Sequence, residues 1–186
     1  MKLNLGCGFN KLDGYVNVDK FETCAPDRVV DLEQTPWPFE TSSVDEIQMI
    51  HVLEHLGATP DLFLGIIKEL YRVCRPGARI RIEVPHPRHE HFLNDPTHVR
   101  VITPGVLSLF SKANCREWEA SGVSNTPLAL YLDVDFEIRK NEMMLDQTYL
   151  DLLMSGQKTE AEIMDLARTL NNVVNEYRIE LEVLKA

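Results

Sequence analysis

The stretch MKLNLGCGFNKLDGYVNVD, residues 1–19, decides the fold of this chain. Within it, the apolar-alternating run Lys2–Leu5 ends at Gly6-Cys7-Gly8, and a second run, Tyr15–Val18, ends at Asp19. We interpret both runs as short strands, because apolar residues alternate along them. A strand that ends in glycines, followed by a strand that ends in an acid, is typical of the beginning of a nucleotide-binding α/β fold.

The residues at the ends of these two strands suit a nucleotide-like ligand. Gly6 and Gly8 lack a Cβ, so a ligand can approach the backbone closely at these positions. The carboxylate of Asp19 can accept hydrogen bonds from ribose hydroxyls. Only residues 9–14 separate the two strands, and a crossover helix needs about ten or more residues. We therefore expect at most one helical turn between them.

Composition restricts the class of protein and its partners. The chain has 186 residues, of which 44% are hydrophobic, and this predicts a single domain, 1–186, with a sizeable core. A formal net charge of -10 argues against nucleic acid or an anionic membrane as the main partner. The four cysteines form no CxxC pair, no apolar run has transmembrane length, and no signal segment precedes the first strand. We expect a cytoplasmic protein with reduced thiols and no membrane partner.

Further elements are expected after Asp19. Apolar runs predict strands at Arg28–Val30, Val44–Ile50, Arg79–Val84 and Leu132–Ile138. Two Thr-Pro pairs predict helix starts, at Thr59-Pro60 for a helix that ends before Pro76-Gly77, and at Thr103-Pro104. The segment Pro36–Phe39, with two prolines, predicts a surface loop. Strands at these intervals with a helix between them indicate a mainly parallel sheet.

The last part of the chain has helical periodicity. Thr159–Glu162 has the capping-box pattern, which predicts the start of a helix. Behind it, apolar residues follow a spacing of three and four: Ile163, Leu166, Leu170, Val173, Tyr177, Leu181 and Leu184. We predict one long helix over about 159–184. Two interpretations stay open: the helix packs on its own sheet, or it pairs with a second copy in a homodimer.

The strand-end motifs form an ordered series that resembles a known family. The series is Asn4–Gly8, Val16–Asp19, Asp31-Leu32, Ser43–Asp45, His51–His55, Glu69–Val73 and Arg75–Ala78. It resembles the class I S-adenosylmethionine-dependent methyltransferases, and among them the small type 11 group, over roughly Leu3 to Phe110. The resemblance implies a Rossmann-like, three-layer α/β/α fold with a mainly parallel sheet and an abbreviated first helix. It also implies S-adenosyl-L-methionine as the cofactor.

By this resemblance, the cofactor contacts residues at four strand ends. Gly6, Cys7 and Gly8 would lie against its methionine portion, Asp19 would bind the ribose, Asp31 and Leu32 would flank the adenine, and His51 would end the strand that forms the pocket floor. The chemistry of the residues agrees, since a carboxylate suits ribose hydroxyls and an apolar side chain suits a purine face. The alternatives are that Asp31 caps a turn and that Leu32 belongs to the core.

Histidines occur in two clusters that could suggest a metal. His51, Glu54 and His55 match the pattern HxxEH of inverted zinc proteases, but that motif needs a helix, whereas a strand is expected to end at His51. The second cluster lies in the loop 85–101, which contains His86, His89, His91, His98 and Asp95. Imidazole and carboxylate suit zinc or iron, yet loop histidines often only form hydrogen bonds. We therefore predict no metal ligands from the sequence.

The resulting prediction is an enzyme that transfers a methyl group to a small-molecule or sugar acceptor by in-line displacement. The loop 85–101 follows the carboxyl end of an expected strand, where the acceptor should enter. We expect His86, Asp95 or His98 to act as the base that assists transfer. Two alternatives stay open: a catalytically silent module that binds the cofactor or a partner, and a metal-dependent hydrolase that uses the histidine loop.

Overall fold

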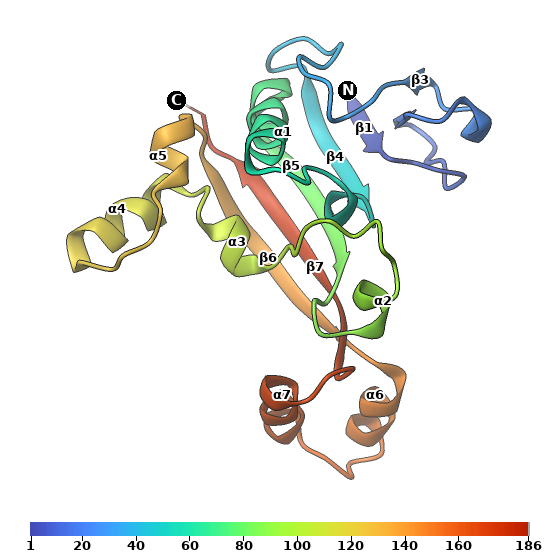
Figure 1. Cartoon of the computed structure of the whole chain (residues 1–186), viewed down its shortest axis with the longest axis vertical. Coiled ribbons are helices and arrows are strands. Elements are labelled where there is room, and N and C mark those ends of the chain that lie inside the picture. The colour runs from blue at the N-terminus through green and yellow to red at the C-terminus, as the bar shows by residue number, and fades with distance from the viewer. Residues whose placement is uncertain (186) are drawn as a thin grey trace.

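A seven-stranded sheet with the order β3-β2-β1-β4-β5-β7-β6 organises the chain (Figure 1). The computed structural model describes residues 1–185. The strands are β1 (Lys2–Leu5), β2 (Val16–Asp19), β3 (Arg28–Val29), β4 (Val44–Ile50), β5 (Cys74–Pro85), β6 (Phe136–Leu145) and β7 (Val174–Val183). Strands β1 to β5 pair in parallel, and β7 is antiparallel to its neighbours β5 and β6. The Rossmann-like, mainly parallel sheet predicted from the sequence is confirmed.

Helices connect the later strands. They are α1 (Pro60–Val73), α2 (Glu90–Leu93), α3 (Pro104–Ser108), α4 (Lys112–Ser121), α5 (Leu128–Leu132), α6 (Gln147–Met154) and α7 (Glu160–Thr169), with single 3-10 turns η1 (Glu22–Cys24) and η2 (Leu53–His55). The predicted helix starts are confirmed, because the side chains of Thr59, Thr103 and Thr159 each accept a hydrogen bond from a backbone N–H of the first turn. None of the helices within residues 1–185 has the length and apolar character needed to cross a membrane.

The core lies on one face of the sheet. Helix α1 lies in front of β5 in Figure 1 and buries Phe63, Ile66 and Leu70. The sheet contributes its alternate residues to the same core, including Ile80 and Ile82. This pattern follows from the side-chain period of two along a strand, which puts every second residue on the covered face.

The opposite face of β5, β6 and β7 carries charged side chains that contact water. Ion pairs cross the strands there, from Arg79 to Glu180 at 2.8 Å and from Arg139 to Glu182 at 2.6 Å. The second helical layer of the expected α/β/α arrangement is therefore missing over this part of the described chain. At the other side of the sheet the connections are short: β1 joins β2 without a helix, as predicted, and only η1 lies between β2 and β3.

The predicted helix over 159–184 is wrong in its second half. Helix α7 ends at Thr169, and the chain then forms β7 between β5 and β6. Along β7, Ile179, Leu181 and Val183 are buried. The apolar spacing of this segment is compatible with periods of two and of 3.6, and its position in the sheet decides between them. A homodimer through a C-terminal helix loses its structural basis.

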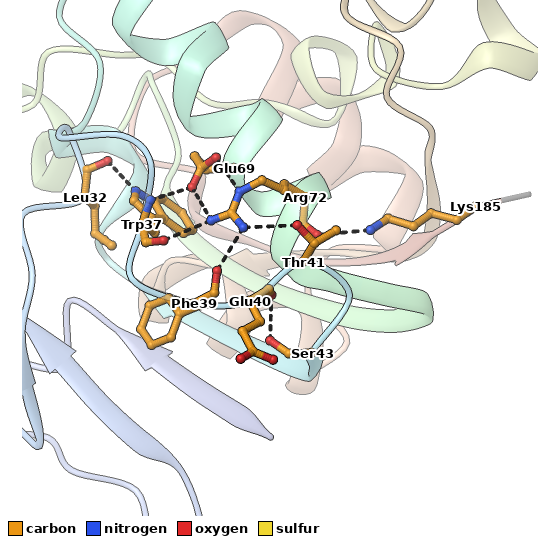
Figure 2. Close-up of polar contacts among 9 residues, drawn as sticks. All are labelled: Leu32, Trp37, Phe39, Glu40, Thr41, Ser43, Glu69, Arg72 and Lys185. Carbon is orange, nitrogen blue, oxygen red and sulfur yellow. Dashed lines mark hydrogen bonds and ion pairs between the residues drawn. The ribbon is translucent and has the colours of Figure 1, made fainter.

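Two smaller predictions also need correction. The strand predicted over Leu132–Ile138 begins only at Phe136, because Leu132 ends α5 and Asp133 has a positive φ of 54°. The segment Pro36–Phe39 is a loop, as expected, but its Trp37 side chain is only 2% exposed. Figure 2 shows why: Trp37 donates from Nε1 to the Leu32 carbonyl at 3.0 Å and from its backbone N–H to Glu69 Oε2 at 2.6 Å.

Candidate functional site

A cavity lies at the carboxyl ends of β1, β2 and β4, next to the segment that follows β3. Its lining contains five of the seven residues predicted to bind a cofactor: Gly6, Asp19, Asp31, Leu32 and His51. The lining also includes residues that the sequence analysis did not assign to a cofactor, namely Lys20, Phe21, Val30, Val52, His55 and Leu56. Three of the six, Lys20, Val30 and Val52, directly follow or precede a predicted site residue, and this adjacency is the signal that could have identified them. Cys7 and Gly8 are not part of the lining.

The Asp19 carboxylate connects the glycine loop to the end of β2. Its Oδ2 accepts a hydrogen bond from the Gly8 N–H at 2.8 Å, and its Oδ1 accepts one from the Phe21 N–H at 3.0 Å. Asp19 is 9% exposed, so it is nearly buried while it still lines the cavity. Gly8 thus contributes to the site by positioning the acid.

The two glycines of the loop have different reasons for lacking a side chain. Gly6 has a φ of +65°, and a Cβ there would come within 2.6 Å of a Val52 methyl group. Gly8 has a φ of +49°, and a Cβ there would meet nothing within 4 Å. Close packing against Val52 therefore requires the glycine at position 6, in addition to any approach by a ligand.

The segment after β3 combines a turn cap with an apolar wall. Asp31 Oδ1 accepts from the Glu33 N–H at 3.0 Å, and Asp31 Oδ2 accepts from Gln34 Nε2 at 3.2 Å. Leu32 is 5% exposed and belongs to the core cluster. Both structural alternatives from the sequence are thus present, while the same two residues also line the cavity. A residue can therefore cap a turn or belong to the core and still line the cavity.

His51 ends β4 in a left-handed conformation, with a φ of 54°. Its Nδ1 lies 3.6 Å from Glu54 Oε1, and its Nε2 lies 3.4 Å from Glu176 Oε2. The Glu54 carboxylate raises the pKa of His51, burial opposes this effect, and Glu176 and Glu83 add to it. The imidazole is therefore a basic group at the edge of the cavity.

A second, open cavity of about 710 Å³ adjoins the first one. It is lined by His51, Glu54, His55, Pro85, His91, Asn94, Asp95, Pro96 and His98. His51 and His55 line both cavities. A molecule in the second cavity would therefore lie beside a molecule in the first.

The structure separates the three predicted catalytic residues. Asp95 and His98 line the second cavity, as expected for residues that meet an acceptor. His86 lies outside the linings of both cavities and is 8% exposed. Its Nδ1 accepts from the Arg88 N–H at 3.2 Å, and its ring packs on Tyr177. Burial and the nearby Arg88 lower the pKa of His86. In this structure His86 packs next to β7, whereas Asp95 and His98 meet the second cavity.

Residues 14–82, from the loop before β2 to β5, match the family model described as a methyltransferase domain. This part of the chain is therefore similar to a methyltransferase domain. The resemblance to the type 11 group is confirmed, because the matching model is that of methyltransferase type 11. None of the curated proteins compared with the chain matches it in sequence.

Solved structures extend the likeness in fold to the whole chain. A SAM-dependent methyltransferase from Archaeoglobus fulgidus is 21% identical, with a TM-score of 0.64 over 97% of this chain and 85% of that chain. One from Methanosarcina mazei is 18% identical, with a TM-score of 0.56 over 100% of this chain and 92% of that chain. The [4+2]-cyclase SpnF is 13% identical, with a TM-score of 0.55 over 100% of this chain and 75% of that chain. At these identities the likeness shows the fold.

Proposed function

We propose that this chain uses S-adenosyl-L-methionine to methylate a small-molecule or sugar acceptor. The observation that carries the proposal is the first cavity, where Asp19, Asp31 and Leu32 come together beside Gly6. Two carboxylates, an apolar wall and a glycine loop at the ends of parallel strands suit a nucleoside ligand. The net charge of -10 supports a small acceptor over a nucleic acid.

Different residues of the first cavity suit different parts of the cofactor. Each oxygen of Asp19 accepts one backbone hydrogen bond and keeps lone-pair capacity for a ribose hydroxyl. Val30, Leu32 and Leu56 provide an apolar surface for the adenine. The cofactor, when bound, supplies a methyl group on a positively charged sulfur. Asp31 lies beside the apolar surface and is the acid that we assign to the adenine.

The second cavity is the place that we assign to the acceptor. Methyl transfer from a sulfonium is an in-line displacement: the acceptor atom bonds to the methyl carbon while the carbon–sulfur bond breaks, and sulfur keeps the electron pair. The protein chiefly aligns the acceptor and excludes water. Asp95 or His98 can take the proton that a hydroxyl or amine acceptor loses, because both line this cavity.

Isothermal titration calorimetry with S-adenosyl-L-methionine and its demethylated product tests cofactor binding. Asp19→Ala should weaken binding by about 1–3 kcal/mol, the cost of losing a hydrogen-bonded carboxylate. Asp13→Ala is the matched control, because Asp13 is an exposed turn residue of the same loop. Circular dichroism checks that Asp19→Ala, which also removes the bond to Gly8, still folds. Equal affinities of the folded Asp19→Ala protein and the wild type would contradict the assignment.

Transfer is tested separately from binding. Wild-type protein is incubated with the cofactor and a panel of small hydroxyl, amine and sugar acceptors, and mass spectrometry measures methylated and demethylated products. His98→Ala and Asp95→Ala should slow transfer while the affinity for the cofactor stays near that of the wild type. Cofactor binding without any transfer would favour the silent-module alternative; the fold is not confined to methyl transfer, since the [4+2]-cyclase SpnF shares it.

A further inference from the structure

The wall of the second cavity contains three potential metal ligands on two separate segments. Glu54 and His55 belong to η2, and His98 belongs to the loop after β5. One ligand atom from each of the three residues lies within 4.8 Å of the other two. We propose that Glu54, His55 and His98 bind a divalent transition-metal ion. Two imidazoles and one carboxylate match zinc best, as in catalytic zinc sites with three protein ligands.

Glu54 is the strongest indication. Its side chain is 1% exposed, and neither carboxylate oxygen has a hydrogen-bond partner among the described residues. His51 Nδ1 lies 3.6 Å from Oε1, which is within ion-pair distance but longer than a hydrogen bond. A buried carboxylate without hydrogen-bond partners is strongly unfavourable unless a cation compensates its charge, and His51 can do so only when it is protonated. A bound metal ion would supply that charge.

The two imidazoles are held so that one nitrogen of each is free to bind a metal. His98 Nδ1 lies 2.9 Å from the Phe92 carbonyl, to which it must donate, so Nε2 keeps its lone pair. The Thr97 hydroxyl donates to Asp95 Oδ1 at 2.6 Å and therefore accepts from His55 Nδ1 at 3.0 Å. His55 Nε2 then also keeps its lone pair. Metal-binding histidines are typically oriented by such hydrogen bonds through the other nitrogen.

Backbone hydrogen bonds keep the two segments together. The Glu54 carbonyl accepts from the Val99 N–H at 2.9 Å and from the Arg100 N–H at 3.1 Å. The Arg100 guanidinium nevertheless does not pair with the Glu54 carboxylate. It donates to the Gly57 carbonyl and lies over the Phe63 ring, with its Cζ 4.3 Å from the ring centroid. Arg100 therefore does not neutralise the Glu54 carboxylate, which stays available to a metal ion.

Three protein ligands leave coordination positions open, and Glu54, His55 and His98 all line the second cavity. An acceptor hydroxyl that binds the metal there would have a lowered pKa and would lose its proton more readily to Asp95, because His98 would then hold the metal and could not take the proton. His55 also lines the first cavity, so the bound acceptor oxygen would lie close to the cofactor. This catalytic role rests on the proposed function, whereas the metal site itself does not.

Zinc titration of chelator-treated full-length protein tests the site. Calorimetry should give one Zn²⁺ per wild-type chain, and Zn²⁺ should raise the temperature of unfolding. Glu54→Gln and His98→Ala should each lower the affinity at least tenfold and abolish the thermal shift. His91→Ala is the matched control, because His91 lies on the same loop and cavity but outside the cluster. It should bind zinc like the wild type.

The possible outcomes separate the metal site from the proposed function. If wild-type protein takes up no Zn²⁺, or if His98→Ala binds it as well as His91→Ala does, the metal site is overturned. If Glu54→Gln does not fold, His55→Ala replaces it, because His55 is only partly buried. Cofactor titration of the same proteins is the second measurement. Zinc uptake without cofactor binding supports the metal site and overturns only the proposed function.

Discussion

The guanidinium of Arg72 makes two hydrogen bonds to the carboxylate of Glu69, from Nε to Oε1 at 2.7 Å and from Nη2 to Oε2 at 2.8 Å (Figure 2). Both residues belong to α1, one turn apart. The pair also binds the loop that follows β3, because Glu69 accepts from the Trp37 N–H and Arg72 donates to the carbonyls of Trp37 and Phe39. One ion pair thus attaches this loop to the helix.

Replacing Glu69 with glutamine should destabilise the protein. The substitution leaves the buried end of Arg72 without its counter-charge, and it should lower the free energy of unfolding by about 2–4 kcal/mol. Urea denaturation followed by circular dichroism measures the change. Asp165→Asn is the control, because Asp165 forms an exposed pair with Arg168 at the same helical spacing. It should cost less than about 0.5 kcal/mol, and similar losses in both variants would contradict the argument.

The same pair should make stability depend on pH. Burial alone would raise the pKa of Glu69, but the hydrogen bonds from Arg72 and Trp37, with the Arg72 charge, lower it below its ordinary value of 4.5. A lowered folded-state pKa stabilises the folded protein above the unfolded value, and this contribution is lost as pH falls through the folded pKa. The stability difference between wild type and Glu69→Gln should therefore be full at pH 7 and shrink below about pH 4.5. A difference that is constant down to pH 3 would refute this.

Two Gly→Ala substitutions should change the stability of the protein in opposite directions. Gly6→Ala introduces a Cβ within 2.6 Å of Val52 at a positive φ, so it should lower stability by about 1–3 kcal/mol and weaken cofactor binding. Gly65 lies within α1, and a Cβ there meets nothing within 4 Å. Gly65→Ala should raise stability by about 0.5–1 kcal/mol, since glycine is unfavourable in a helix. Thermal unfolding of both variants, with calorimetric cofactor titration, measures these effects. Equal stability of the two variants would show that Val52 moves aside freely.

A charge on the buried face of β7 should unfold the domain. Leu181 is 3% exposed, and Leu181→Asp should cost more than about 3 kcal/mol because a carboxylate would be buried without a partner. Glu180→Gln, on the opposite face, changes only a surface pair with Arg79 and should cost less than about 1 kcal/mol. Light scattering and circular dichroism distinguish the two models. A folded monomer from Leu181→Asp would be expected only if this segment were a helix that pairs with a second copy.

Local signals made much of the fold predictable. Strand β4, Val44–Ile50, has the predicted bounds, and Thr59 caps α1 as predicted, because such patterns act within a few residues. The segment at Leu181 was misassigned because its apolar spacing suits a helix and a strand, and only pairing with β5 decides between them. Burial of Trp37 depends on Glu69, which lies 32 residues later and has no local signature.

The candidate site was predictable to a similar degree and for the same reason. Asp19 and His51 end strands, and parallel strands put their carboxyl ends at one edge, so their proximity followed from the fold class. His55 and His98 meet through a loop whose path the sequence does not define. The three-residue cluster with Glu54 therefore appears only in the folded chain.

The loop 85–101 is attached to α7 and the residues after it, so the two cavities depend on different parts of the chain. Arg88 donates to the carbonyls of Ala167 and Arg168, and the Glu90 N–H donates to Asn172 Oδ1 at 2.8 Å. The segment 146–173 between β6 and β7 thus supports the loop that forms a wall of the second cavity, whereas residues 6–56 supply the lining of the first. Mutations in the segment 146–173 can therefore alter the wall of the second cavity, the proposed acceptor site, without changing a residue that lines the first cavity. If the second cavity takes the acceptor as proposed, a library confined to residues 146–173 would vary the support of its wall and leave the lining of the first cavity unchanged.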